Sequence, residues 1–173
     1  MKYDIEVLFA RRSIRKYESG SELSPLDIRQ LLEAAMCAPS ARNRQPWHFV
    51  VITQRNTLQE LASQHPYAGM LHSATAAVLV CGCMEEEPEE GYIVQACAAA
   101  TQNILLACHG KGLGAVWLGV HPRTERIEMV RKLLNVPASI LPVSLISIGY
   151  PAEKKPRNAN YRQSRVHYHV WNP

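Results

Sequence analysis

The sequence predicts one globular domain in which helices and strands alternate. The chain has 173 residues, of which 47% are hydrophobic and 20% charged, a size and composition typical of a single compact domain. Apolar residues recur at helical spacing in some segments and form short β-branched runs in others. No internal repeat and no long Gly/Ser linker marks a boundary, so we expect residues 1–173 to form one domain.

The first half of the chain is expected to contain three helices and two strands. A short helix over residues 3–11 has Ile5, Leu8 and Phe9 on one face. The next helix has the clearest boundaries, because Ser24 is a favourable N-cap, Pro25 takes the first helical position and Pro39 lies beyond the end. The elements that follow are a strand over 48–53, a helix over 56–64 and a strand over 76–83.

The longest predicted helix covers residues 92–109 and is apolar nearly all round. Its middle, residues 96–100, reads Ala-Cys-Ala-Ala-Ala, so the helix must be covered on several sides, in the core or at an interface. After it we expect a strand over 115–118, a helix over 125–135 capped by Thr124, and a strand over 143–148. Residues 167–171 alternate like a strand but have little to pair with, which indicates pairing elsewhere, for example with another subunit.

The cysteines and the apolar segments indicate a cytoplasmic protein with no membrane partner. No apolar stretch approaches the ~18 residues of a membrane span, and the opening residues lack the apolar core of a signal peptide. The five cysteines are odd in number, and four lie in apolar stretches, so reduced thiols fit better than disulfides. We expect no metal, because Cys81-x-Cys83 and His167-x-His169 each lack a second ligand pair at a known spacing.

The basic residues are clustered although the net charge is only +4. The three clusters, which could converge in the fold, are Arg11, Arg12, Arg15 and Lys16; Arg42 and Arg44; and Lys154, Lys155 and Arg157. No reader motif or interleaved aromatic stack accompanies them, so we expect no nucleic acid partner. The acidic run from Glu85 to Glu90 predicts a solvated loop that favours the dipole of the following helix.

Three polar or glycine-rich segments have the chemistry to bind a small molecule. Arginine forks and a hydroxyl in residues 11–13 suit a phosphate, although a solvated basic face is the simpler alternative. Residues 39–46 supply the donors and acceptors needed to read a heterocycle, with an ordinary polar loop as the alternative. Residues 112–119 lack the dinucleotide-binding fingerprint, but their glycines permit a flat ligand to approach backbone N–H groups near Leu118 and Gly119.

Taken in order, these segments resemble the nitroreductase family of FMN-dependent oxidoreductases, in particular its short members. The matching segments span essentially the whole chain: Arg-Arg-Ser-Ile-Arg-Lys-Tyr at 11–17, Ala-Pro-Ser-Ala-Arg-Asn-Arg-Gln-Pro-Trp-His at 38–48, Gln102-Asn103, Gly-Leu-Gly-Ala-Val-Trp-Leu-Gly at 112–119, and Ile-Gly-Tyr-Pro at 148–151 followed by Lys155 and Arg157. The resemblance implies an α+β fold of three layers, with a mixed, mainly antiparallel sheet flanked by helices. It also implies an intertwined homodimer with FMN in the interface, in which the arm of residues 157–173 is exchanged with the partner.

The resemblance further implies a set of FMN contacts. Those to the phosphate and the ribityl chain would be Arg11, Arg12, Ser13, Lys155 and Arg157, with Lys154 as an alternative to Lys155. Arg15 would lie near the pyrimidine edge of the flavin. The contacts to the isoalloxazine ring, from the other subunit, would be Pro39, Ser40, Ala41, Arg42, Asn43 and Gln45. Leu118 and Gly119 would present backbone N–H groups toward flavin N5.

The activity implied by the resemblance is hydride transfer from NADH or NADPH to flavin N5, followed by reduction of a nitroaromatic, a quinone or a similar small acceptor in a ping-pong mechanism. Because the cofactor carries this chemistry, we predict no catalytic side chain. Two alternatives stay open: an FMN-binding protein without efficient turnover, for storage or sensing, and a flavin-dependent dehalogenase-like reductase. The acceptor is left open, because residues 67–74, where longer members often place further contacts, form a short segment here.

Overall fold

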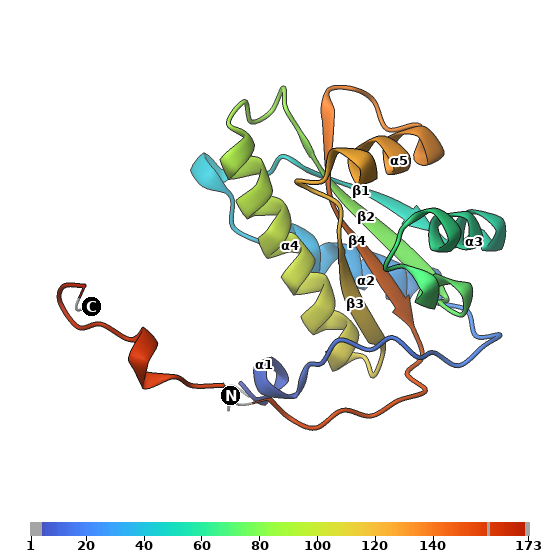
Figure 1. The fold of residues 1–173 in the computed structure, drawn as a ribbon, viewed down its shortest axis with the longest axis horizontal. Coiled ribbons are helices and arrows are strands. Elements are labelled where there is room, and N and C mark those ends of the chain that lie inside the picture. Colours follow the sequence, from blue (N-terminus) through green and yellow to red (C-terminus); the bar gives the residue numbers. More distant parts are fainter. Residues whose placement is uncertain (1–4, 159, 172–173) are drawn as a thin grey trace.

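A four-stranded antiparallel sheet forms the middle layer of the fold (Figure 1). The computed structural model describes residues 5–158 and 160–171, and its strand order is β1-β2-β4-β3. The strands are β1 (Trp47–Ile52), β2 (Ala76–Cys83), β3 (Gly114–Gly119) and β4 (Ile140–Gly149). The two central strands, β2 and β4, are buried almost throughout, which explains why β2 is a continuous apolar run and β4 is apolar apart from the buried Ser144 and Ser147.

Helices cover both faces of the sheet, and each face has its own core. One core contains residues of α2 (Pro25–Met36) and α4 (Glu90–Gly110). The other contains residues of α3 (Arg55–Gln64) and α5 (Thr124–Leu134). Because alternate strand residues point to opposite faces, neighbours in β2 serve different cores: Val78 packs with the first and Leu79 with the second. This arrangement confirms the three-layer α+β fold.

All nine helices and strands predicted for residues up to 148 are present, with boundaries that differ by a few residues. The first, α1 (Glu6–Ala10), is shorter than predicted, and residues 3 and 4 lie outside the described residues. At α2, Ser24 Oγ accepts from the Asp27 backbone N–H at 3.0 Å, and the Asp27 side chain accepts in return from the Ser24 N–H. The predicted cap of α5 is wrong, because Thr124 is the first helical residue and Arg123 is the N-cap.

The long helix α4 is apolar enough, and long enough, to cross a membrane by length and composition alone. The expectation that no stretch approaches this length is therefore wrong. In the fold, α4 contributes to the core with α2 and the sheet, and 44% of its most apolar window is buried. The core helices of soluble proteins pass the same test, and burial against the sheet is the reason for the composition of α4.

The acidic run before α4 is not solvated throughout, which corrects the expectation for one residue. Glu85, Glu86, Glu89 and Glu90 are exposed, but Glu87 is only 1% exposed. One oxygen of Glu87 accepts from the Glu89 backbone N–H at 3.1 Å. The other lies 3.6 Å from Nε of Arg44. Glu87 is thus a buried ion-pair partner that links the turn after β2 to the segment before β1.

The C-terminal arm extends away from the rest of the chain (Figure 1). Within residues 160–171 the regular structure is one 3-10 turn, Gln163–Arg165. The alternating residues 167–171 do not form a strand in this chain; instead the rings of His167 and Trp171 stack with centroids 4.1 Å apart. Tyr168, Val170 and Trp171 are largely exposed. Exchange of the arm with a second copy stays a prediction.

Candidate functional site

The N-terminal segment after α1 lies against the edge of the sheet. Ser13 forms a parallel bridge with Ala115 of β3, and the Ile14 N–H donates to the Ala115 carbonyl at 3.0 Å. Tyr17 forms an antiparallel bridge with Pro151, just beyond β4. Figure 1 shows this segment and the chain after β4 running together across one end of the domain. The first and the last basic clusters are therefore brought together.

Two glycines allow this close approach. Gly114 and Gly149 are partners across β3 and β4. A Cβ on Gly114 would lie 2.7 Å from Ile14 Cγ2, and a Cβ on Gly149 would lie 2.7 Å from Tyr17 Cγ. The buried Tyr17 hydroxyl is 2.9 Å from the Ile14 carbonyl oxygen, and burial raises the pKa of Tyr17, which keeps the phenol neutral. The flat surface of the two glycines thus sets the position of the arginines that precede Tyr17.

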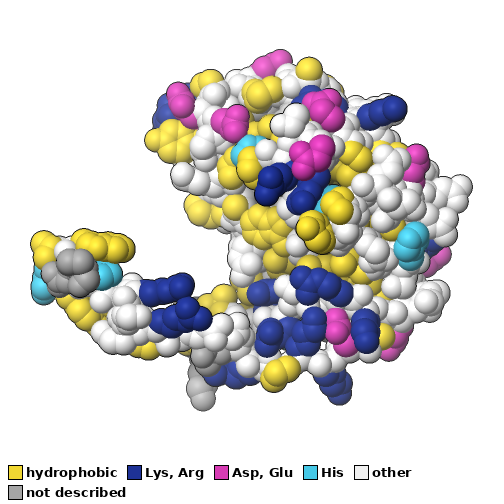
Figure 2. Space-filling view, in the orientation of Figure 1, with side chains coloured by type: hydrophobic (Ala, Val, Ile, Leu, Met, Phe, Trp, Pro, Cys, Tyr) yellow, Lys and Arg dark blue, Asp and Glu magenta, His cyan; other side chains and the backbone are white. Residues whose placement is uncertain are grey.

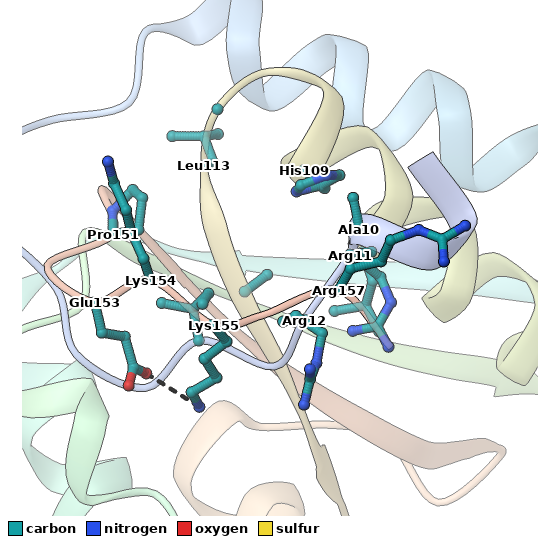
Figure 3. Close-up of a pocket in the computed structure, with 14 residues that line it drawn as sticks. Ala10, Arg11, Arg12, His109, Leu113, Pro151, Glu153, Lys154, Lys155 and Arg157 are labelled. Atoms are coloured by element: carbon teal, nitrogen blue, oxygen red, sulfur yellow. Dashed lines mark ion pairs between the residues drawn. The ribbon is translucent and has the colours of Figure 1, made fainter. Parts of the chain in front are cut away.

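A basic cavity of about 380 Å³ opens between this segment, the chain after β4, the end of α4 and the start of β3 (Figure 3). Five cationic side chains and one carboxylate, that of Glu153, line it. The lining residues are Ala10, Arg11, Arg12, Ile14, Leu105, His109, Gly112, Leu113, Ala115, Pro151, Glu153, Lys154, Lys155 and Arg157. Figure 2 shows Lys and Arg side chains gathered over this end of the domain. Such an excess of fixed positive charge suits an anion.

Hydrogen bonds hold the lysine side of the basic cavity in place. Lys155 Nζ donates to the Ser13 carbonyl at 2.6 Å and lies 3.3 Å from Oε1 of Glu153. The same Glu153 oxygen accepts from the backbone N–H groups of Arg15 at 2.6 Å and Lys16 at 3.2 Å. The hydrogen bond from Arg15, together with Lys155, lowers the pKa of Glu153. Ser13 and Arg15 thus reach this region through backbone atoms.

The arginines of the basic cavity are also positioned by neighbours. The Arg12 guanidinium donates to the carbonyl of Pro156, a residue 144 positions later in the chain. Arg157 Nε lies 2.7 Å from Oε1 of Glu6, and its guanidinium lies over the Phe9 ring, 4.5 Å from the centroid. These contacts restrict the rotamers of long side chains before an anion arrives, which reduces the entropy lost on binding.

The Pro39–Gln45 segment has an uncommon backbone. Arg42, Asn43 and Gln45 have positive φ angles of 53°, 53° and 52°, a conformation rare for residues other than glycine. Ser40 Oγ accepts from the Gln45 backbone N–H at 2.9 Å and closes the turn. Backbone strain of this kind concentrates at functional sites, so this segment is a candidate binding loop.

Within one chain, the Pro39–Gln45 segment and the basic cavity lie at different ends of α4. The segment lines a hollow of about 240 Å³ with Gln95 and its neighbours on α4, whereas the basic cavity contains His109. Along α4 the hollow reaches Ala99 and the basic cavity begins at Leu105, six positions or roughly 9 Å further at ~1.5 Å per residue. The basic cluster of Arg42 and Arg44 therefore does not join the other two. No residue of this segment lines the basic cavity within one chain.

Gly119 lies at the far end of β3 from Ala115. Its carbonyl oxygen accepts from Arg126 Nη1 at 2.9 Å and lies 3.2 Å from Nε2 of His65. His65 Nδ1 accepts from the Tyr67 backbone N–H, so Nε2 carries the proton, and burial lowers the pKa of His65 and favours this neutral form. β3 is an edge strand, and the Ala115 carbonyl accepts from Ile14 on the side away from β4. Because the N–H and C=O groups of successive strand residues alternate between the two sides, those of Gly119 also point to the open edge.

Sequence reasoning missed Glu153, Glu6 and the apolar wall of the basic cavity. Glu153 had one usable signal, since it is the single acidic residue between Pro151 and the basic cluster. Glu6 and the wall residues, among them Leu105 and Leu113, had none, because their roles depend on which distant segments meet. Gln102 and Asn103 were noted only as a motif; Asn103 Nδ2 donates to the Ala34 carbonyl at 3.0 Å and fastens α4 to α2.

Comparison with known proteins points to one family. A family model described as the nitroreductase family matches residues 8–82 and 62–150. A protein of Methanothermobacter thermautotrophicus, provisionally named NADH dehydrogenase/NAD(P)H nitroreductase, is 42% identical over 96% of this chain and 87% of its own length.

Solved structures agree with the sequence comparison. A Parabacteroides distasonis protein with the same provisional name superposes with a TM-score of 0.92 at 38% identity, covering 96% of this chain and 98% of that one. A Desulfovibrio desulfuricans protein, provisionally named a nitroreductase and solved in complex with FMN, gives a TM-score of 0.81 at 32% identity, covering 98% and 97%.

Proposed function

The chain belongs to the nitroreductase family, and on that premise we propose that it is an FMN-dependent oxidoreductase that uses NADH or NADPH to reduce a small acceptor such as a nitroaromatic or a quinone. The basic cavity carries this proposal, because five cationic side chains line a volume of about 380 Å³. The FMN complex of the Desulfovibrio protein supports the choice of FMN as the anion. The free state of the five cysteines supports a cytoplasmic location.

The residues of the basic cavity fit a phosphate monoester. Arg11, Arg12 and Arg157 offer planar forks that can bind phosphate oxygens in pairs, and Lys155 adds a fixed point charge beside them. Ser13 is proposed to contact the ribityl chain, and Arg15 to lie near the pyrimidine edge. Both lysines line the cavity, and the Ser13 carbonyl and Glu153 hold the Lys155 amine in place there. We assign the phosphate to Lys155 and test Lys154 separately.

The ring of FMN is proposed to lie between two copies of the chain. One copy would supply the open edge of β3 at Gly119; the predicted N–H contact from Leu118 does not fit this edge, because the backbone of Leu118 is turned to its partner Leu145 on β4. The second copy supplies Pro39, Ser40, Ala41, Arg42, Asn43 and Gln45. The separation of this segment from the basic cavity along α4 supports the assignment, because one chain alone does not bring the two together.

The chain's own residues bind and orient in this mechanism. FMN, when bound, would supply the hydride-transfer chemistry that no side chain here provides, and the residues of the basic cavity would hold its phosphate. Arg15 adds positive charge at the pyrimidine edge, where negative charge develops on reduction, and this stabilises the charge electrostatically. The backbone at Gly119 stays in place because Arg126 and His65 hold its carbonyl. No side chain is assigned as a proton donor or nucleophile.

Mixing the FMN-loaded protein with NADH or NADPH under anaerobic conditions is expected to bleach the flavin absorbance rapidly. Free FMN at the same concentration is the control, since it measures reduction without the protein. Addition of a nitroaromatic or a quinone should then restore the flavin absorbance. Persistent colour would instead favour a binding protein without turnover. A protein that fails to quench FMN fluorescence would contradict the cofactor assignment itself.

A chain that ends at Val166 is expected to lose the dimer while retaining the sheet and its helices. The deleted residues include Tyr168, Val170 and Trp171, which are 64%, 66% and 79% exposed in one chain and need a partner to bury them. Size-exclusion chromatography with light scattering measures the change. Trp171→Ala in the full chain removes apolar area without shortening the arm, so it distinguishes these two causes of dimer loss. A stable, flavin-loaded dimer of the truncated chain would refute exchange of the arm.

A further inference from the structure

Three metal-ligating side chains converge outside the proposed FMN site. An imidazole nitrogen of His48, the Sγ of Cys83 and a carboxylate oxygen of Glu86 all lie within 4.8 Å of one another. His48 Nε2 and Glu86 Oε2 are 3.5 Å apart. We propose that these residues bind a divalent transition metal ion, with Zn²⁺ as the best match. The proposal does not depend on the flavin function.

The register of the sheet brings the first two ligands together. Trp47 of β1 is paired with Gly82 of β2, and both face α4, because Trp47 is in that core and a Cβ on Gly82 would meet Ile93. Their neighbours His48 and Cys83 therefore lie on the opposite face of the sheet. His48 is paired with Cys81 and so is the diagonal neighbour of Cys83, a separation that a histidine side chain can bridge.

The turn after β2 brings the third ligand back to the strands. The Cys83 N–H donates to the Pro46 carbonyl at 2.8 Å, and the Glu87 N–H donates to the Cys83 carbonyl at 3.1 Å. These bonds curl residues 83–87 over the end of the sheet and place Glu86 beside His48. Backbone hydrogen bonds thus set the positions of all three ligands, although only Cys83 is buried.

The spacing and the donor types fit zinc. Bonds of about 2.0–2.3 Å in a tetrahedron place ligand atoms about 3.4–3.6 Å apart. The His48–Glu86 separation of 3.5 Å already has this value, and the thiol sulfur, which lies within 4.8 Å of the other two ligand atoms, needs to approach them by at most about 1.3 Å. The side chains of His48 and Glu86 are 52% and 45% exposed, so the ion would keep a position open to solvent. One nitrogen, one sulfur and one oxygen are ligands that Zn²⁺ accepts.

The neighbouring charges leave the Glu86 carboxylate available to a metal ion. Arg44 Nη1 donates to the backbone carbonyl of Glu86 at 2.9 Å, and Arg44 Nε lies 3.6 Å from the buried carboxylate of Glu87. The guanidinium charge is thus balanced by Glu87. The simpler alternative is an ion pair of protonated His48 with Glu86, beside an unrelated thiol. Metal binding differs from this ion pair because it requires a neutral imidazole and a thiolate.

Two other buried thiols do not compete for a metal at neutral pH. Burial raises the pKa of Cys97 and Cys108 to about 12, so these two thiols stay protonated. Cys37 is exposed at the end of α2 and is the matched control. A thiolate signal that depends on Cys83 and not on Cys37 therefore identifies the proposed site.

The test is equilibrium dialysis of the chelator-treated full chain against Zn²⁺, followed by Co²⁺ difference spectra recorded at equal flavin content. We expect one Zn²⁺ per chain and a thiolate-to-cobalt charge-transfer band. Cys83→Ser should abolish the band, and His48→Gln and Glu86→Gln should each weaken Zn²⁺ binding about tenfold or more. Cys37→Ser should change neither signal. Glu86 is exposed, so its variant tests the site without disturbing the core.

Equal Zn²⁺ binding by Cys83→Ser and the wild type would overturn the proposal, as would absence of binding by the wild type. Loss of the band in Cys37→Ser alone would assign the signal to that surface thiol, which also overturns it. FMN content, measured in the same samples, reports the flavin function separately. The two proposals can therefore fail independently.

Discussion

Replacing Arg11 and Lys155 together by alanine is expected to weaken FMN binding by roughly two to four orders of magnitude. Each side chain is proposed to lose a charge-assisted hydrogen bond to phosphate, about 1.5–3 kcal/mol, and about 1.4 kcal/mol corresponds to a tenfold change in affinity. Both line the basic cavity, and Lys155 also holds the Ser13 carbonyl that positions the N-terminal segment. Fluorescence titration of FMN into the two single variants and the double variant measures the effect.

The matched control is the double variant Arg29→Ala with Lys132→Ala, which removes the same charge from α2 and α5. Arg29 is on the surface, in an ion pair with Glu33. FMN affinity should be unchanged there. Unchanged affinity in the Arg11 and Lys155 variant would show that the phosphate binds elsewhere. Lys154→Ala alone distinguishes the two lysines, since a loss larger than that of Lys155→Ala would assign the phosphate to Lys154.

Gly149→Ala is expected to destabilise the fold by about 1–3 kcal/mol and to reduce FMN binding with it. The added Cβ would lie 2.7 Å from Cγ and 3.1 Å from Cβ of Tyr17, atoms close to the backbone that cannot rotate away. Tyr17 is only 6% exposed, so the whole N-terminal segment must shift. Because that segment carries Arg11 and Arg12, the basic cavity should open. Urea unfolding and FMN titration measure the two consequences.

Gly69→Ala is the matched control, because a Cβ there meets nothing within 4 Å and its φ is not in the left-handed region. Its stability should stay within about 1 kcal/mol of the wild type. If Gly149→Ala has the stability and FMN affinity of the control, the close packing of Tyr17 on the sheet does not position the site. Loss of stability with full FMN affinity would show that the close packing of Tyr17 on Gly149 stabilises the fold but is not needed for cofactor binding.

Local signals account for the elements that were predicted correctly. The capping box at Ser24 and the proline that follows it define the start of α2 without reference to the rest of the chain. The apolar middle of α4 indicated a helix covered on several sides, and its helix lies in the core between α2 and the sheet. The four strand segments were visible because each is a short, mostly apolar run.

The predictions that failed concern residues whose environment is set by distant parts of the chain. Glu87 lies in an acidic run whose composition predicts exposure to solvent. In the fold, Glu87 is buried beside Arg44, which comes from a different segment of the chain. The predicted pairing of residues 167–171 with another subunit stays a prediction, because a strand requires a neighbour and the described residues of one chain provide none along the extended arm. Thr124 has the chemistry of a cap and instead begins the helix, one residue later than the capping position.

By itself, the sequence determined the order of the elements, the fold class and the chemical character of the candidate motifs, since caps, periodicity and side-chain chemistry act over a few residues. Only the tertiary structure decided which motifs meet. Pairing of Ser13 with Ala115 and of Tyr17 with Pro151 joined the first and last basic clusters into one cavity. The length of α4 kept the middle cluster away from it. Such pairings depend on sheet register and on packing over the whole domain, which no local pattern encodes.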